Sequence, residues 1–277
     1  MVYNVVNGQG AITDEEVSVP SSPLSFNYAE LWSQEQYNSA SDYSNYLRER
    51  NGKAVVFPGY MNRNQNLSYF DSNSVRLADA AFFSSGAFHL ELGNNHSDGN
   101  SPVPAMLDNE FFPSSTTQVS SDLRSAMKVN YDFAVAYENL LSDPAIRRNG
   151  HDVDKVWFDD LTSNLNGYGG GGSIWFQDYR HPQFEVLHFI NLTNANDQWR
   201  NARSTPTEYF NKTVHYYRLP TGVNINKCYL ASPDRNGGAP QDLGCTTQTD
   251  QYGAYLSFQI PDLMYWDMVY FDRGGQY

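Results

Sequence analysis

The first 150 residues alternate short apolar runs with helical patterns, and this alternation limits the possible folds more than any other feature of the chain. Strands that alternate with helices are typical of βα units and a parallel sheet. The expected strands are 2–7, 24–30, 54–57 and the 80–91 region. The expected helices are 41–51, 71–79 and one from Ser120 or Ser121 to about Leu141.

Four βα units are half of a (β/α)8 barrel, which normally needs about 250 residues. The sequence therefore predicts the C-terminal half of such a barrel. A small open α/β sheet is the alternative, although no Gly-rich phosphate loop marks a nucleotide site.

From residue 151 the pattern changes to short alternating runs separated by turn residues, which is typical of an antiparallel sandwich. The runs are 156–158, 173–176, 184–190, 214–217, 227–230, 252–260 and 268–271. The predicted fold class is thus α/β plus all-β. We expect two domains, a half-barrel over 1–150 and a Greek-key β-sandwich over 151–277.

Charge and hydropathy exclude several classes of partner. The formal net charge of −13 and a pI near 4.7 argue against nucleic acid and anionic membranes. No apolar run approaches the length of a membrane span, and the first residues have neither the basic region nor the cleavage site of a signal peptide. Cys228 and Cys245 could form a disulfide or remain two thiols.

One strand ends in a carboxylate flanked by aromatic residues. Glu30 lies between Tyr28 and Trp32 at the end of the 24–30 strand. Barrel enzymes place catalytic groups at such strand ends, and a carboxyl group between aromatic walls can have a raised pKa suited to a general acid. The alternative is a surface glutamate at a strand end.

The sequence predicts no cofactor and no catalytic metal. His89, Glu91 and His96 are the nearest approach to a ligand set, but their spacing matches no zinc signature. The Asp-rich loops of the second domain leave calcium binding open.

A set of motifs, in order, resembles glycoside hydrolase family 66, which comprises dextranases and cycloisomaltooligosaccharide glucanotransferases. The resemblance covers nearly the whole chain. The motifs are FNYAELW at 26–32, YMN at 60–62, HLELG at 89–93, MLDNEFFP at 106–113, YDFAVAYENLL at 131–141, LHFINL at 187–192, LASPD at 230–234 and IPDLMYWDM at 260–268.

This resemblance implies a retaining endo-hydrolase of α-1,6-glucan, with an Asp nucleophile on the fourth barrel strand and a Glu acid/base on the sixth. The Tyr-x-Glu-x-Trp segment of that sixth strand matches 28–32, so Glu30 takes the acid/base role and strand 2–7 becomes the fifth. No Asp in the chain matches the nucleophile motif, and Asp14 lies in a loop. Because the chemistry needs two carboxyl groups about 5–5.5 Å apart, we expect this chain to be a fragment that is inactive alone.

The resemblance also implies a set of substrate-binding residues. Polar side chains at strand ends hydrogen-bond sugar hydroxyls, or else satisfy loop backbone groups. Glu91 is a rival to Glu30 as the acid, and Glu110 could equally brace a loop. The predicted substrate-binding residues are Asn7, Tyr28, Trp32, Tyr60, Asn62, His89, Glu91 and Glu110.

Between the two activities of the family, the sequence favours the dextranase, acting on dextran and isomaltooligosaccharides. The resemblance implies that the enzyme is secreted. Cyclising members carry a carbohydrate-binding module after the segment that matches 60–62, and only a short helix separates that segment from Ala80 here. The alternatives are a glucanotransferase and a carbohydrate-binding fragment without catalysis.

Overall fold

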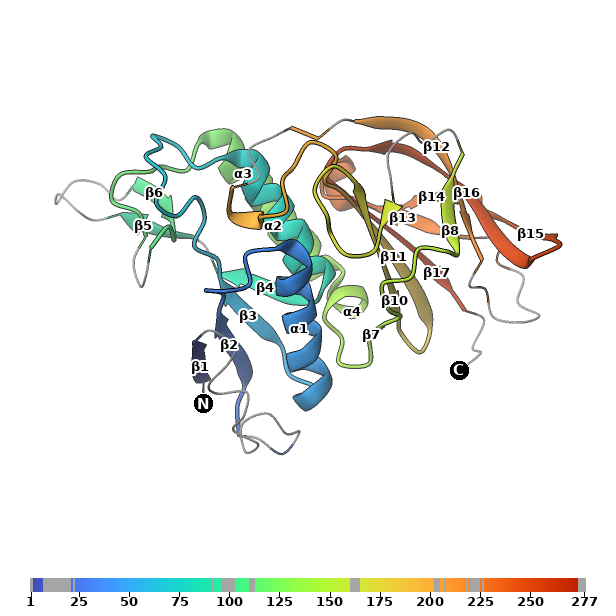
Figure 1. Cartoon of the computed structure of the whole chain (residues 1–277), viewed down its shortest axis with the longest axis horizontal. Helices are drawn as coiled ribbons and strands as arrows, with labels where there is room; N and C mark the ends of the chain where they lie inside the picture. The colour runs from blue at the N-terminus through green and yellow to red at the C-terminus, as the bar shows by residue number, and fades with distance from the viewer. Residues whose placement is uncertain are drawn as a thin grey trace.

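The computed structural model describes residues 2–6, 21, 23–90, 92–95, 103–109, 113–159, 165–201, 205–206, 208–217, 219, 225 and 227–273. A four-stranded sheet lies at the lower left of the view in Figure 1, beside the helices. Its strands are β1 (Val2–Val6), β2 (Phe26–Glu30), β3 (Val55–Pro58) and β4 (Ala87–Leu90), in that spatial order and all parallel. The parallel pairing is the one that the strand and helix alternation predicts.

The helices that connect these strands begin and end at local signals. They are α1 (Tyr37–Asn51), α2 (Ser72–Ser84), α3 (Ser121–Ala136) and the short α4 (Glu138–Leu141). The Asp71 side chain accepts a hydrogen bond from the Ser74 N–H at 2.8 Å, and Ser120 accepts one from the Leu123 N–H at 3.2 Å. Gly52 ends α1 at a φ of 68°, in the left-handed region that glycine adopts without strain.

Two expectations for this half of the chain were wrong in detail. Residues 80–84 lie in α2 and only 87–90 form the strand, because the Ala-Phe-Phe run continues the buried side of the helix. The single long helix is interrupted at Tyr137, which separates α3 from α4. Val135, near the end of α3, is 69% exposed.

Two further sheets follow, each built largely from the predicted runs and antiparallel except for one parallel pairing at 165–166. The larger sheet has the path β14-β13-β17-β11-β10-β7, with β9 beside β10, and the smaller has the order β15-β16-β12-β8. Their bounds are β7 (Arg147–Arg148), β8 (Val156–Phe158), β9 (Leu165–Asn166), β10 (Ile174–Arg180), β11 (Phe184–Asn191), β12 (Tyr209–Tyr216), β13 (Tyr229–Ala231), β14 (Gln241–Asp242), β15 (Thr246–Asp250), β16 (Gly253–Leu263) and β17 (Trp266–Asp272).

Shorter elements complete the described fold. They are the hairpin of β5 (Leu92–Asn95) with β6 (Val103–Met106), and the 3-10 turns η1 (Trp199–Asn201) and η2 (Asn236–Gly238). Within the described residues, no helix has the length and apolar character needed to cross a membrane.

Two apolar clusters hold these layers together. The first contains residues of β2–β4, α1–α3 and one face of the larger antiparallel sheet, so the helices are packed between two sheets (Figure 1). The second fills the space between the two antiparallel sheets and includes Cys228 and Cys245, which are buried free thiols. The first cluster joins elements on both sides of residue 150; the division into domains at that residue stays a prediction.

Alternation along β2 places Glu30 on a defined face of the parallel sheet. Ala29 and Leu31 belong to the first apolar cluster, on the side of the helices. Since successive side chains point to opposite faces, Tyr28 and Glu30 lie on the other face.

Candidate active site

Glu30 ends β2 and is only 5% exposed. The indole Nε1 of Trp32 donates a hydrogen bond of 2.7 Å to Glu30 Oε2. This short bond fixes one carboxyl oxygen. The burial of Tyr28 raises the pKa of its phenol, and the negative charge of Glu30 adds to the rise, so Tyr28 stays a neutral hydroxyl beside the carboxyl group.

The Trp32 ring is held in place by Tyr60 and Arg63. Its ring lies 5.0 Å from the ring of Tyr60, and the guanidinium carbon of Arg63 lies 4.3 Å from the indole centroid. Tyr60 itself is 1% exposed. A partly exposed cation–aromatic contact of this kind is worth about 0.5–1 kcal/mol. The Tyr60–Trp32–Arg63 stack therefore orients the donor that holds Glu30.

Arg200 ties this region to the second half of the chain. Its Nη1 donates to the Tyr60 carbonyl at 2.7 Å and its Nη2 donates to the Leu31 carbonyl. The guanidinium also lies 4.2 Å from the ring of Trp199, and burial lowers the pKa of Arg200 to about 10, which still leaves it charged at neutral pH. It thereby fixes the backbone just after β2 and just after β3.

Asn62 organises the loop after β3, with its side chain directed into the protein. Its Nδ2 donates to the Arg200 carbonyl at 2.9 Å, and its Oδ1 accepts from the Asp71 N–H at 2.9 Å. It is 3% exposed and has a φ of 50°, which asparagine tolerates better than most residues. This placement favours a bracing role, with the predicted contact to sugar untested.

His89 lies on the helix side of the parallel sheet. Its Nδ1 is 2.8 Å from Asp79 Oδ1, and the other oxygen of Asp79 accepts a hydrogen bond of 2.8 Å from Asn130. The His89 ring packs edge-on against Phe82 in α2 at 4.9 Å. Because His89 is 1% exposed and held among α2 and α3, its geometry favours a structural role over direct contact with sugar.

The structure thus brings together Tyr28, Glu30, Trp32 and Tyr60, with Arg63 and Arg200 added. The predicted residues Asn7, Glu91 and Glu110 lie outside the described residues. Arg200 gave no signal in the sequence, because its partners at 31 and 60 are 169 and 140 positions away.

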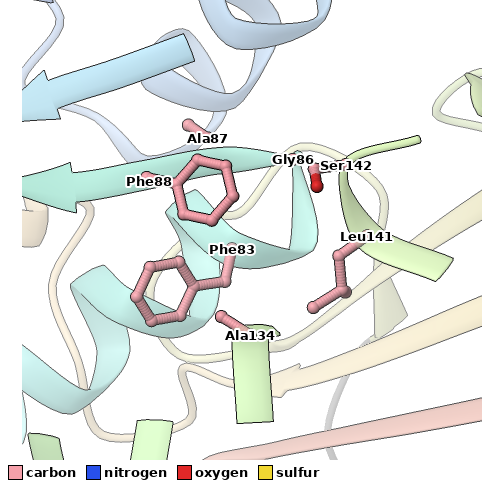
Figure 2. A pocket seen from close by; sticks show the side chains of 7 residues that line it. All are labelled: Phe83, Gly86, Ala87, Phe88, Ala134, Leu141 and Ser142. Carbon is pink, nitrogen blue, oxygen red and sulfur yellow. The ribbon is translucent and has the colours of Figure 1, made fainter. Parts of the chain in front are cut away.

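An apolar hollow lies beside the N-terminal end of β4, whereas Glu30 lies at the C-terminal end of β2 (Figure 2). It is lined by Phe83, Gly86, Ala87, Phe88, Ala134, Leu141 and Ser142. Ser142 supplies its one polar side chain, so the hollow offers no chemistry for catalysis. Among the described residues, no group of three His, Cys, Asp or Glu side chains is placed to hold a metal ion.

The carboxyl group at the end of β2 lies among the aromatic residues that the sequence predicted for the site. It is buried, accepts a hydrogen bond from Trp32 and lies close to the phenol of Tyr28. A carboxyl group of this kind transfers protons efficiently when a second carboxylate attacks from the opposite side.

Comparison with known proteins identifies the family. The family model for glycosyl hydrolase family 66 matches residues 1–270, and the chain belongs to that family. A cycloisomaltooligosaccharide glucanotransferase of Niallia circulans is 40% identical over 207 residues, which are 75% of this chain and 20% of that protein. A dextranase of Streptococcus salivarius is 19% identical over 311 aligned residues, covering 97% of this chain and 37% of that protein.

The fold agrees with this assignment. The crystal structure of a Paenibacillus cycloisomaltooligosaccharide glucanotransferase, complexed with cycloisomaltoheptaose, matches with a TM-score of 0.85 and 26% identity. The match covers 98% of this chain and 55% of that one. The chain spans about a fifth of the length of the curated glucanotransferases that it matches.

Proposed function

We propose that this chain is the acid/base-bearing part of a retaining glycoside hydrolase that cleaves α-1,6-linkages in dextran. The observation that carries the proposal is Glu30, buried at the end of β2 and held by Trp32 at 2.7 Å. In this account β1–β4 are strands five to eight of a (β/α)8 barrel. The two later sheets form the Greek-key sandwich assigned to 151–277, with β7 at 147–148 added at the edge of the larger sheet.

The mechanism assigns two steps to Glu30. In the first, its protonated carboxyl group donates to the departing glycosidic oxygen while a carboxylate nucleophile attacks the anomeric carbon. In the second, the ionised Glu30 takes a proton from water, which then displaces the sugar from the nucleophile. We assign the nucleophile to a segment outside these 277 residues, so this chain alone is inactive. The polypeptide that contains both parts is called the full-length enzyme below.

The choice of acceptor in the second step separates the two known activities of the relatives. Water gives linear products, and a hydroxyl group of the same glucan gives a cyclic product. The alignment with the dextranase covers 97% of this chain, whereas the glucanotransferase alignment covers 75%. The short connection of 13 residues between β3 and α2, 59–71, also favours the dextranase. We therefore propose endo-hydrolysis. We also propose that the enzyme is secreted, because the family resemblance implies it.

Glucan transfer is the second candidate, because the glucanotransferase is the more similar in sequence, at 40% against 19% identity. Mass spectrometry of the products of the full-length enzyme on dextran decides between them. We expect linear isomaltooligosaccharides; cyclic products that lack one water would establish the transferase.

A test of the fragment is independent of that choice. The purified 277-residue chain should release no reducing sugar from dextran. Release of isomaltooligosaccharides by this chain would contradict our placement of the nucleophile.

A further inference from the structure

The outer face of the smaller antiparallel sheet carries a row of aromatic rings that the proposed catalytic role does not use. Along β8, β12 and β16, the residues Val156, Tyr216 and Leu256 point into the second apolar cluster. Their neighbours Trp157 and Tyr255 therefore point outward. Tyr217, just after β12, joins them.

These rings stack on one another across the sheet. The Trp157 and Tyr217 centroids are 4.5 Å apart with 27° between their planes, and Tyr217 and Tyr255 are 4.8 Å apart, also at 27°. His215 packs beside Trp157 at 5.0 Å. We call Trp157, His215, Tyr217 and Tyr255 the aromatic platform. Because each ring fixes the next, a ligand that binds there has little side-chain motion to restrict.

A hollow of about 430 Å³ opens beside the platform. Trp157 and Tyr217 line it together with Asp154, Lys155, Asp250 and Tyr252. Trp157 is 38% exposed and Tyr252 is 79% exposed. Aromatic walls with a few polar groups are the usual composition of a small-molecule site.

The polar groups favour a neutral ligand rich in hydroxyl groups. Tyr217 donates a hydrogen bond to Asp250 Oδ2, which lowers the pKa of Asp250 and keeps it an ionised acceptor. Asp154 supplies a second carboxylate and Lys155 a donor. A chain of net charge −13 repels polyanions, whereas sugar rings present C–H faces to aromatic rings and hydroxyl groups to carboxylates.

We propose that the aromatic platform and its hollow bind α-1,6-glucan at a site separate from Glu30. The strands β8, β12, β16 and β15 lie on the far side of the molecule from β1–β4 (Figure 1). A glucan polymer is long enough to occupy such a site while another segment of it is cleaved, which would raise the local concentration of substrate. The identity of the glucan rests on the proposed function; the site itself rests on the geometry.

Binding of the 277-residue chain to dextran tests this proposal without requiring catalysis. Retardation in a native gel containing dextran, and titration with isomaltooligosaccharides followed by tryptophan fluorescence, give the affinity. We expect Trp157→Ala and Tyr252→Ala each to weaken binding about tenfold. Tyr252 lies in an exposed turn, so its variant tests the site even if Trp157→Ala unfolds the sheet.

Phe210→Ala is the matched control, because Phe210 lies on β12 and is 57% exposed but does not line the hollow. It should bind as the unmodified chain does. Equal binding by Tyr252→Ala and the unmodified chain would overturn the proposal, as would the absence of any dextran binding. Binding lost in Glu30→Gln but kept in Trp157→Ala would locate the glucan at β2 instead.

A linear α-1,4-glucan serves as the comparison ligand. Equal affinity for both glucans would overturn the assignment to α-1,6-linkages. Failure of the proposed catalytic role is a different result, because it is measured as cleavage by the full-length enzyme.

Discussion

The indole of Trp32 donates a 2.7 Å hydrogen bond to the carboxyl group of Glu30, two residues before it on the same segment. The two side chains are therefore one unit: the strand end positions the carboxyl group, and the aromatic ring fixes its rotamer. Tyr60 and Arg63 in turn hold the ring.

Removing this donor should reduce catalysis more than stability. Trp32→Phe keeps a ring for the contacts with Tyr60 and Arg63 but loses the N–H. A hydrogen bond to a charged group is worth about 1.5–3 kcal/mol, so we expect kcat of the full-length enzyme to fall at least about tenfold. Tyr46→Phe, on α1 and 37% exposed, is the control and should leave kcat unchanged. An unaltered kcat in Trp32→Phe would show that the hydrogen bond does not orient the acid/base.

Arg200 should be a stabilising residue for the loops around Glu30. Arg200→Met removes its donors from the carbonyls of Leu31 and Tyr60, which lie in a buried region. We expect the free energy of unfolding in urea to fall by about 3 kcal/mol. Arg124→Met, on the exposed side of α3, should change it by about 0.5 kcal/mol or less. Equal stability of the two variants would contradict the bridging role.

The His89–Asp79–Asn130 network should stabilise the folded protein without contributing to substrate binding. Asp79→Ala removes the carboxylate that contacts His89 and accepts a hydrogen bond from Asn130, and the loss of one member of a buried pair costs about 3–5 kcal/mol. Urea unfolding measures this. His89→Gln should lower stability while leaving the KM for dextran of the folded full-length enzyme unchanged. A raised KM without loss of stability would restore direct contact between His89 and sugar.

His188 makes stability depend on pH. It is fully buried, accepts a hydrogen bond of 3.2 Å from Trp266 Nε1, and burial lowers its pKa to about 3. Its unfolded pKa is about 6.5. As the pH falls below that value, the unfolded chain binds a proton that the folded chain does not, so stability is lost. Between about pH 6.5 and 4.5 the loss is roughly 2 kcal/mol.

His188→Asn removes the titration and keeps an acceptor for Trp266. Urea unfolding at both pH values should show a pH dependence smaller than that of the unmodified chain by this amount. An identical pH dependence in both proteins would exclude His188 as its source.

Local features of this fold could be predicted from the sequence. The caps Asp71 and Ser120 and the stop at Gly52 depend only on neighbouring residues, and β2 follows from its own apolar pattern. β15 gave no signal, because its residues 246–250 are polar and it pairs at the edge of a sheet. The break at Tyr137 likewise left the helical periodicity intact.

The candidate site likewise has a part that could be predicted from the sequence and a part that could not. Glu30 and Trp32 are close in sequence, and their alignment on one strand end could be predicted. The side of the sheet on which His89 lies depends on strand register, and Arg200 reaches Leu31 and Tyr60 only through tertiary packing. Long-range contacts of this kind have no local pattern.

The most direct test of the account is the cleavage of two substrates by the full-length enzyme with Glu30 replaced. Glu30→Gln should lower kcat/KM on dextran by about 10²–10⁴-fold. An isomaltosyl fluoride, whose leaving group needs no proton, should still form the glycosyl intermediate, and azide should turn over the Glu30→Ala variant to an α-glycosyl azide of retained configuration. Cleavage of dextran by Glu30→Gln at the unmodified rate, or loss of both substrates with no rescue by azide, would contradict the assignment of Glu30 as the acid/base.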